Sequence, residues 1–257
     1  MDGTLLNSKG KVSPQFFELF QKLQQHQIHF VAASGRQHNS IVDKLSLIKN
    51  NIFVIAENGA IAKKEEDILL LNPLESQKII KMIPVLRSIK DANMVLCSQN
   101  NAFIESKNER FISLFQEYYH SFHTVDDLIE IVKTNAILKI AVYHFNSSEE
   151  HIYPEIKHLK NDFLLKISGK NWLDISDAKA NKGNALKVVQ KMLNITKEET
   201  MVFGDYHNDL EMLDCAHFSF AMKNAHTDIK NVANFETESN DNFGVEKVLK
   251  KLIEAKS

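Results

Sequence analysis

The chain has 257 residues, of which 44% are hydrophobic and 25% are charged, and its formal net charge is −2. This length fits one large or two moderate domains, and the apolar content argues against a disordered chain. The charge balance gives no basic footprint for nucleic acid, and no run approaches the roughly 18 apolar residues of a membrane span. Cys97 and Cys215 lie outside any CxxC pair, which argues against zinc and disulfides. Without a signal-peptide pattern, we expect a cytoplasmic enzyme or binding protein.

The first part of the chain alternates helix and strand patterns. Ser13 is expected to cap a helix that begins at Pro14 and runs to residue 27, with an apolar stripe from Phe16 to Leu23. Residues 28–33 and 52–56 predict buried strands, because they are short, apolar and rich in β-branched and aromatic residues. A second helix is expected over 38–49. This alternation predicts a parallel sheet with helices on both faces.

The middle of the chain predicts a different, largely antiparallel α+β unit. Its expected strands are 94–97, 102–105, 137–143 and 163–168, and its expected helices are 75–90, 108–120 and 148–160. The last part returns to the first pattern, with helices over 182–193, from 210 and over 244–255, and strands over 200–203 and 218–222. The predicted fold class is therefore α/β, with a Rossmann-like three-layer α/β/α core (1–73 and 176–257) and an inserted α+β unit (74–175).

Polar residues follow three of the predicted core strands. The segments are SGR at 34–36, ENG at 57–59 and GDYHND at 204–209, and a fourth segment, NKG at 181–183, stands at a helix start. Ligands of open α/β sheets bind at the carboxyl ends of the strands. We therefore expect these segments to converge on one pocket.

Several of these residues are suited to holding a phosphate and a cation. Asp205, Asn208 and Asp209 offer two carboxylates and an amide, which are oxygen ligands that suit Mg²⁺, although Asn208 or Asp209 could instead cap the following helix. Ser34 can bond a phosphate oxygen or cap a helix. Lys182 can neutralise phosphate charge or lie on a surface. Each signal is weak alone, and the set in this order is specific.

The same residues carry a resemblance to a known family. The order DGTLL (2–6), SGR (34–36), KG (182–183) and GDxxND (204–209) resembles the haloacid dehalogenase superfamily. More narrowly, it looks like the Cof-type phosphatases, which resemble sugar-phosphate phosphatases with a large α/β cap between the second and third motifs. ENGA (57–60), AMxNA (221–225) and the tail 237–245 match as well. The resemblance spans nearly the whole chain and is least informative across the cap.

The resemblance implies catalytic roles position by position. Asp2 matches the general acid/base, and its backbone carbonyl is expected to ligate Mg²⁺. Ser34 and Lys182 are expected to hold the phosphoryl oxygens. Asp205 and Asp209 complete the expected metal site.

The expected substrate contacts are Gly3, Gly35, Arg36, Asn58, Asn208 and Asn224. The activity that the resemblance implies is Mg²⁺-dependent hydrolysis of a small phosphate ester through an aspartyl-phosphate, with sugar phosphates as the expected substrates. The expected protein is a monomer or weak homodimer without nucleic-acid or membrane partners. Phosphomutase and trehalose-type phosphatase chemistry stay open, because the cap sequence does not reveal the substrate.

One departure concerns the first motif, which reads Asp-x-Asp-Gly-Thr in the family. Met1 occupies the middle position, so the nucleophilic aspartate and the central strand that carries it are expected immediately before residue 1. Two explanations are open: a start site set several residues too late, or a damaged or repurposed chain that binds phosphate without catalysis. A second departure is Lys223, where the family usually has glycine, and strain is expected there if the position needs a positive φ.

Overall fold

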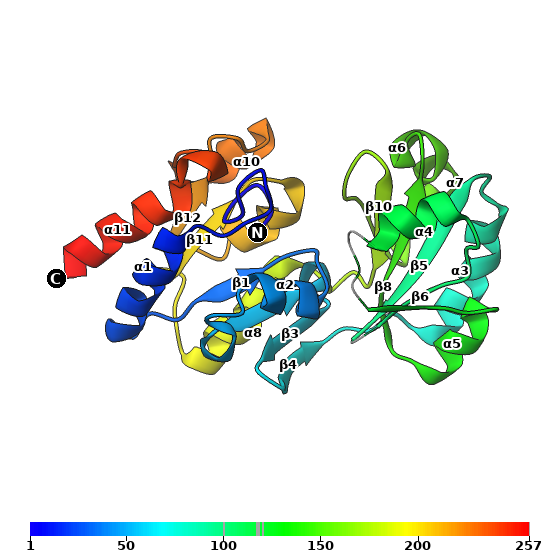
Figure 1. Ribbon diagram of the computed structural model, residues 1–257, viewed down its shortest axis with the longest axis horizontal. Helices are drawn as coiled ribbons and strands as arrows, with labels where there is room; N and C mark the ends of the chain where they lie inside the picture. The colour runs from blue at the N-terminus through cyan, green and yellow to red at the C-terminus, as the bar shows by residue number, and fades with distance from the viewer. Residues whose placement is uncertain (100, 117–118, 120, 257) are drawn as a thin grey trace. The chain divides into compact units, whose positions relative to one another are not determined.

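The computed structural model describes residues 1–99, 101–116, 119 and 121–256 (Figure 1). It contains two compact units. The first comprises Met1–Gly35, Ile41–Leu70 and the chain from Asn181 onward, and the second comprises Arg36–Ser40 and Leu71–Ala180. The domain borders near 73 and 176 stay a prediction, since compactness does not test independent folding. None of the helices in the described ranges has the length and apolar character needed to cross a bilayer.

The first unit begins with the predicted helix, α1 (Pro14–Gln25). The hydroxyl of Ser13 accepts the N–H of Phe16 at 3.2 Å, so Ser13 is the N-cap. The same hydroxyl donates to Oε1 of Glu246 at 2.6 Å, in the packed helix α11 (Gly244–Lys256). The apolar stripe of α1 is buried, as predicted from its spacing: Phe16, Leu19, Phe20 and Leu23.

The strands of the first unit form two sheets. One has the order β1-β2-β3-β4, and its strands are β1 (Val31–Ala33), β2 (Phe53–Ala56), β3 (Ile61–Lys64) and β4 (Asp67–Leu71). The other has the order β11-β12-β13, and its strands are β11 (Met201–Gly204), β12 (Phe218–Ala221) and β13 (Phe235–Glu236). β1 is parallel to β2, and β11, β12 and β13 are parallel to one another. The predicted parallel pairing is thus present in two pieces, with β1 and β11 each at a sheet edge, whereas β3 is antiparallel to β2.

Two elements of this unit are shorter than predicted. β1 begins at Val31 instead of residue 28, because its ladder with β2 begins with Val31 opposite Phe53. α2 (His38–Lys44) ends before residue 49, because the N–H groups of Ile48 and Asn51 bond carbonyls three residues back. That tighter pattern leads into the 3₁₀ helix Lys49–Asn51.

The carboxyl-terminal part of this unit contains α8 (Lys182–Leu193), as predicted, and its N-cap Asn181 accepts the N–H of Asn184 at 2.8 Å. Three further helices follow: a 3₁₀ turn (His207–Asp209), α9 (Leu210–Leu213) and α10 (Thr227–Val232). α10 and β13 were not predicted. The 3₁₀ helix Asn240–Asn242 precedes α11.

The second unit has a sheet in the order β7-β6-β5-β8-β10-β9. Its strands are β5 (Ala92–Ser98), β6 (Ala102–Ile104), β7 (Phe122–Thr124), β8 (Ile137–His144), β9 (Leu164–Ile167) and β10 (Trp172–Ser176). All neighbours are antiparallel except β6 and β7, which are parallel. The predicted largely antiparallel α+β character is therefore confirmed, while β7 and β10 were missed.

The helices of the second unit are α3 (Ser76–Ser88), α4 (Glu109–Gln116), α5 (Leu128–Thr134), α6 (Ser148–His151), α7 (Tyr153–Ile156) and the 3₁₀ helix Lys157–Asn161. The single helix predicted over 148–160 is wrong. Pro154 lies in the first turn of α7 and has no N–H, so the helical bonding is interrupted there. The predicted end of α4 at residue 120 lies outside the described residues.

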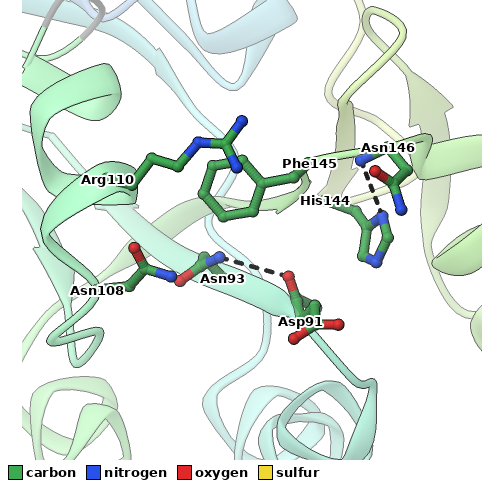
Figure 2. Close-up of a pocket in the computed structure, with 8 residues that line it drawn as sticks. Asp91, Asn93, Asn108, Arg110, His144, Phe145 and Asn146 are labelled. Atoms are coloured by element: carbon green, nitrogen blue, oxygen red, sulfur yellow. Dashed lines mark hydrogen bonds between the residues drawn. The ribbon is translucent and has the colours of Figure 1, made fainter.

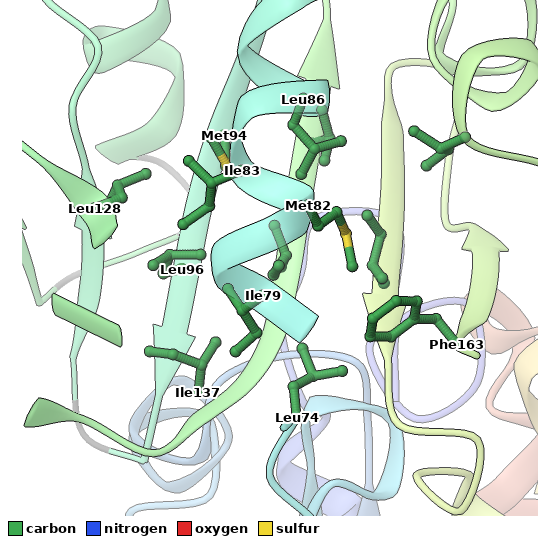
Figure 3. Packing of buried hydrophobic residues seen from close by; sticks show 14 of the residues in the cluster. Leu74, Ile79, Met82, Ile83, Leu86, Met94, Leu96, Leu128, Ile137 and Phe163 are labelled. Carbon is green, nitrogen blue, oxygen red and sulfur yellow. The ribbon is translucent and has the colours of Figure 1, made fainter. Parts of the chain in front are cut away.

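The core of the second unit is formed by α3 against the sheet (Figure 3). The buried side chains of α3 are Ile79, Met82, Ile83 and Leu86. Their spacing places them on one helix face, where they share a cluster with Leu96 of β5 and Ile137 of β8. This packing gives the second unit a hydrophobic core of its own.

Candidate active site

The amino-terminal segment connects the two sheets of the first unit. The nitrogen of Met1 donates to the carbonyl of Ala33, the last residue of β1, at 3.3 Å. Three residues later, Oγ1 of Thr4 donates to Oδ1 of Asp205 at 2.6 Å. Asp205 follows the last residue of β11. The segment therefore lies at the carboxyl ends of both edge strands, where ligands of such sheets bind.

This segment is a tight turn that needs a glycine. The N–H groups of Thr4, Leu5 and Leu6 converge on the carbonyl of Met1 at 3.2, 3.0 and 2.9 Å. Gly3 has a φ of +66°, and a Cβ there would collide with the carboxylate of Asp205. Glycine thus permits both the left-handed backbone and the close approach to that carboxylate.

Asp209 joins the turn after β11 to the start of α8. Its Oδ1 accepts from Nζ of Lys182 at 2.7 Å, and both side chains are buried. Its Oδ2 accepts the N–H groups of Asp205 and Tyr206 at 3.0 and 3.3 Å. The side chain of Asp209 makes no cap bond to α9. It therefore fixes the ammonium of Lys182 and the backbone around Asp205.

The two carboxylates of this turn have opposite pKa shifts. Burial raises the pKa of Asp205, and repulsion from Asp209 adds to this, while the bond from Thr4 opposes it. Burial also opposes ionisation of Asp209, but the charges of Lys182 and the amino terminus and the hydrogen bonds from Lys182 and the N–H of Asp205 together outweigh it, so the pKa of Asp209 is lowered. A desolvated carboxylate beside a second one is stabilised by a divalent cation. Asp205 therefore has the chemistry of a ligand for a hard cation such as Mg²⁺.

Ser34 and Asn58 bring the ends of β1 and β2 to the same network. The N–H of Asn58 donates to the carbonyl of Ser34 at 3.1 Å. Its side-chain Oδ1 accepts from Nδ2 of Asn208 at 3.0 Å. Glu57 and Asn58 have φ values of 48° and 56°, which non-glycine residues rarely adopt. Such strain concentrates at functional sites, and here it accompanies a contact to the Asp205–Asp209 turn.

The remaining predicted residues occupy varied surroundings. Asn224 is exposed, and its Nδ2 donates to the carbonyl of Gly3 at 2.8 Å, so it joins the network. At Gly35 a Cβ would lie 2.8 Å from Oδ1 of Asn58. Asp2 is exposed, and its backbone forms an isolated bridge with Leu6.

Arg36 belongs to the second unit. Its Nη1 donates to Oγ of Ser40, in the same unit, at 3.5 Å.

Some members of the network were not predicted as site residues. Thr4 was part of the DGT motif, and its partner Asp205 gives it a place in the network. Asn240 donates from Nδ2 to the carbonyl of Leu6 at 2.9 Å, and its N–H bonds Oδ1 of Asn224 at 3.1 Å. Nothing in the local sequence marks Asn240, because both contacts are long-range.

The strain considered for Lys223 does not arise. This residue is not among those with a positive φ in the described chain. Its ammonium forms an ion pair with Glu238 at 3.6 Å. A lysine therefore fits where the family usually has glycine.

A polar cavity of about 460 Å³ lies in the second unit (Figure 2). Its lining includes Asp91, Asn93, Asn108, Arg110, His144 and Asn146, and the guanidinium of Arg110 lies 4.3 Å from the ring centre of Phe145. The cavity is lined by His144, the last residue of β8. The segment that enters the unit contacts the opposite end of this strand, because the N–H of Leu74 donates to the carbonyl of Ile137 at 2.7 Å. None of the predicted site residues lines this cavity, so it is separate from the network described above.

Comparison with known proteins decides the family. Residues 1–249 match the model of the haloacid dehalogenase-like hydrolases. The chain belongs to this family. A similar curated protein is the 5-amino-6-(5-phospho-D-ribitylamino)uracil phosphatase YbjI of Escherichia coli (strain K12), which is 29% identical, with 98% of this chain and 94% of the relative covered. The predicted membership, and with it the prediction of a phosphatase of this superfamily, is confirmed.

Two solved structures share the fold. SMU.1108c from Streptococcus mutans UA159 matches with a TM-score of 0.88 and 26% identity, over 98% of this chain and 96% of that one. The subclass IIB sugar phosphatase BT4131 matches with a TM-score of 0.83 over 98% and 96% of the two chains. At 21% identity, the second likeness shows the fold alone. The predicted α/β fold class is thereby confirmed.

Proposed function

We propose that this protein is a Mg²⁺-dependent phosphohydrolase that removes phosphate from small metabolites, with sugar phosphates as the substrate class. One observation carries this function: the buried pair Lys182 and Asp209 and the half-buried Asp205 form a charged cluster at the carboxyl ends of the strands, and the turn 1–4 is bonded to it. The relative YbjI is named for a substrate that carries a phosphorylated ribityl group, and this name supports a phosphorylated sugar or sugar derivative as the substrate here. A cytoplasmic location and a monomeric or weakly dimeric state belong to the same proposal.

The residues of the cluster have different roles in the proposed reaction. Asp205 holds the metal, because its pKa is raised by burial and it gains from a cation. Both oxygens of Asp209 already accept bonds, so its part in the metal site is to fix Asp205 and Lys182. Magnesium bound there neutralises charge on the transferring phosphoryl group. Lys182 and the buried hydroxyl of Ser34 hold the phosphoryl oxygens.

The attacking group is an aspartate that the family pattern puts directly before residue 1. In support, Met1 and Thr4 bond the ends of two edge strands, β1 and β11, so a preceding residue would approach both. Its carboxylate oxygen forms a bond to phosphorus as the ester P–O bond breaks, and Asp2 donates a proton to the leaving alcohol. Asp2 then takes a proton from the water that hydrolyses the aspartyl-phosphate.

Substrate contacts come from residues around the same network. Gly3, Gly35, Asn58, Asn208 and Asn224 surround the turns that carry Thr4 and Asp205, and Arg36 follows β1 by sequence. Their amides and backbone groups suit hydroxyl groups of a sugar as well as phosphate oxygens.

The test compares this chain with one extended upstream by the in-frame codons that precede it. We expect the extended chain to hydrolyse p-nitrophenyl phosphate and sugar phosphates, and to lose this activity with EDTA or with Asp205→Asn. Asp214→Asn changes an exposed carboxylate of the same unit and is the matched control. A hydroxylamine-sensitive phosphoryl adduct is expected in rapid-quench mass spectra. Inactivity of both chains towards every phosphate ester would instead indicate a phosphate-binding protein without catalysis.

A further inference from the structure

Two histidines and an aspartate outside the cluster described above lie together on the first unit. His207, His226 and Asp228 each offer a ligand atom, and these atoms lie within 4.8 Å of one another. Nε2 of His207 is 2.9 Å from Oδ2 of Asp228, and Nδ1 of His226 is 3.4 Å from the same oxygen. His226 and Asp228 are exposed, so solvent reaches the group. We propose that these three residues bind a transition-metal ion of the zinc type, at a site distinct from the magnesium site.

The spacing of the donor atoms fits such an ion. Zinc bonds imidazole nitrogen and carboxylate oxygen at about 2.0–2.2 Å, so neighbouring ligands of a tetrahedral ion are about 3.3 Å apart. The two distances to Asp228, 2.9 and 3.4 Å, lie on either side of that value. The third pair of ligand atoms, on His207 and His226, lies within 4.8 Å, and small side-chain movements would bring these two atoms to the same spacing. Water completes the coordination, because the group is open to solvent.

The donor set separates this site from the one at Asp205. Imidazole nitrogen suits zinc, copper and nickel, whereas magnesium prefers oxygen ligands and keeps several waters. His207 and His226 supply two nitrogen donors, while the ligand proposed for magnesium is a carboxylate. The two sites therefore differ in the metal they select.

The backbone holds the three ligands in position. His207 begins the 3₁₀ turn His207–Asp209, and Asp228 lies in the first turn of α10. The N–H of His226 donates to the carbonyl of Asp205 at 2.9 Å, which joins the two segments next to the ligands. In the absence of metal, Nδ1 of His226 accepts the N–H of Asp228 at 3.2 Å. This ring nitrogen has one lone pair, so an ion bound to it would replace that bond. A bound ion would fasten the start of α10 to the turn that carries Asp205 and Asp209.

The test measures Zn²⁺ binding to the full chain by calorimetry, with Mg²⁺ in excess so that the Asp205 site does not compete. His226→Asn removes the imidazole but keeps a residue that caps helices well. Asp228→Asn keeps the shape of the carboxylate. His217→Asn changes an exposed histidine of the same unit outside the cluster and is the matched control.

We expect the wild type and His217→Asn to bind one zinc ion, and the other two variants to bind it at least about 10-fold more weakly, as loss of a group that supports a metal ligand already does. Zinc is also expected to raise the melting temperature of the wild type and not of His226→Asn or Asp228→Asn. Wild-type affinity in both variants, or no zinc binding by the wild type, would overturn the proposal. Neither readout involves phosphate transfer, so the outcome is independent of the proposed phosphatase activity.

Discussion

The ammonium of Lys182 lies 2.7 Å from Oδ1 of Asp209, and the two side chains are only 3% and 5% exposed. Removing two charges from water is costly, and the cost is offset only when the pair is close and the other lone pairs are bonded. Here the N–H groups of Asp205 and Tyr206 bond the second oxygen of Asp209. Both carboxylate oxygens of Asp209 are therefore bonded, and the pair holds the ammonium of Lys182, which is proposed to face the phosphoryl group.

Breaking this pair is expected to destabilise the first unit strongly. Lys182→Met leaves the buried carboxylate of Asp209 without its cation, which costs about 3–5 kcal/mol in the free energy of unfolding. The double variant Lys182→Met with Asp209→Asn is expected to recover part of this loss, because no uncompensated charge remains. Urea denaturation at neutral pH, followed by circular dichroism, measures both values.

An exposed pair in the same unit provides the control. Nζ of Lys197 lies 3.7 Å from Oδ1 of Asp214, and the side chains are 51% and 80% exposed. Lys197→Met is expected to change the unfolding free energy by less than about 1 kcal/mol, because solvent screens such pairs. Equal effects of the two lysine substitutions would contradict the structural role of the buried pair.

The bond from Thr4 to Asp205 is expected to tune the metal site. It is 2.6 Å long and lowers the pKa of a carboxyl that burial raises. Thr4→Val keeps the shape of the side chain but removes the donor, so Mg²⁺ affinity is expected to fall about 10-fold or more, as for other groups that support a ligand. Calorimetric titration with Mg²⁺ checks this, and Thr4→Ser, which keeps the hydroxyl, is expected to bind like the wild type. A Thr4→Val variant with unchanged affinity would show that the bond is irrelevant to metal binding.

Gly3 is expected to tolerate no side chain. Gly3 has a φ of +66°, and the carboxylate of Asp205 lies where a Cβ would be, so Gly3→Ala combines backbone strain with a collision. We expect a loss of about 1–3 kcal/mol in unfolding free energy, together with weakened Mg²⁺ binding. Gly169→Ala is the matched control, because nothing lies within 4 Å of a Cβ there. If both alanines were neutral in thermal melts, the close approach of Gly3 to Asp205 would be wrong.

Elements with strong local signals could be predicted from sequence. α1 and α8 begin at the predicted residues because Ser13 and Asn181 are capping residues placed directly before an apolar stripe. Both signals act within a few residues, so tertiary packing does not override them.

Two strands that contain buried charged residues could not be predicted from the sequence. β10 contains Asp174, which is buried and lies 3.7 Å from Lys139 of β8. β3 contains Lys63, which is buried as well. Charged residues at buried positions break the apolar pattern by which strands are recognised, so these strands were missed.

The candidate site, like the fold, could be predicted only in part from the sequence. Convergence of the segments after β1, β2 and β11 could be predicted, because strand ends of a parallel sheet meet at one edge. The partners of individual atoms could not. The contact of Thr4 with Asp205 spans 201 positions, and Asn240 reaches Leu6 across 234. His207 and His226 likewise come together only in the folded chain, where the N–H of His226 bonds the carbonyl of Asp205.

The second unit contains a pH-dependent ion pair that involves none of the residues proposed to bind a metal. The guanidinium of Arg87 donates to both oxygens of Glu105 at 2.7 Å and to Oδ1 of Asp127 at 2.6 Å. Hydrogen bonding from Arg87 lowers the pKa of Glu105, although partial burial opposes it, and the N–H of Leu128 adds to the lowering. Since the pKa is lower in the folded state, this stabilisation is present above the unfolded pKa and is lost as the pH falls through the folded pKa.

Glu105→Gln is therefore expected to destabilise the second unit at neutral pH by about 1 kcal/mol, a value limited by solvent screening at the partly exposed Arg87. The difference from the wild type is expected to shrink as the pH is lowered below about 4, where the unfolded carboxyl titrates. The single tryptophan, Trp172, lies in β10, so its fluorescence during urea denaturation reports on this unit. Glu130→Gln, in an exposed pair with Lys133, is the control and is expected to show little difference at any pH. A Glu105→Gln difference that stayed constant down to strongly acidic pH would mean that the charge of Glu105 does not stabilise the fold.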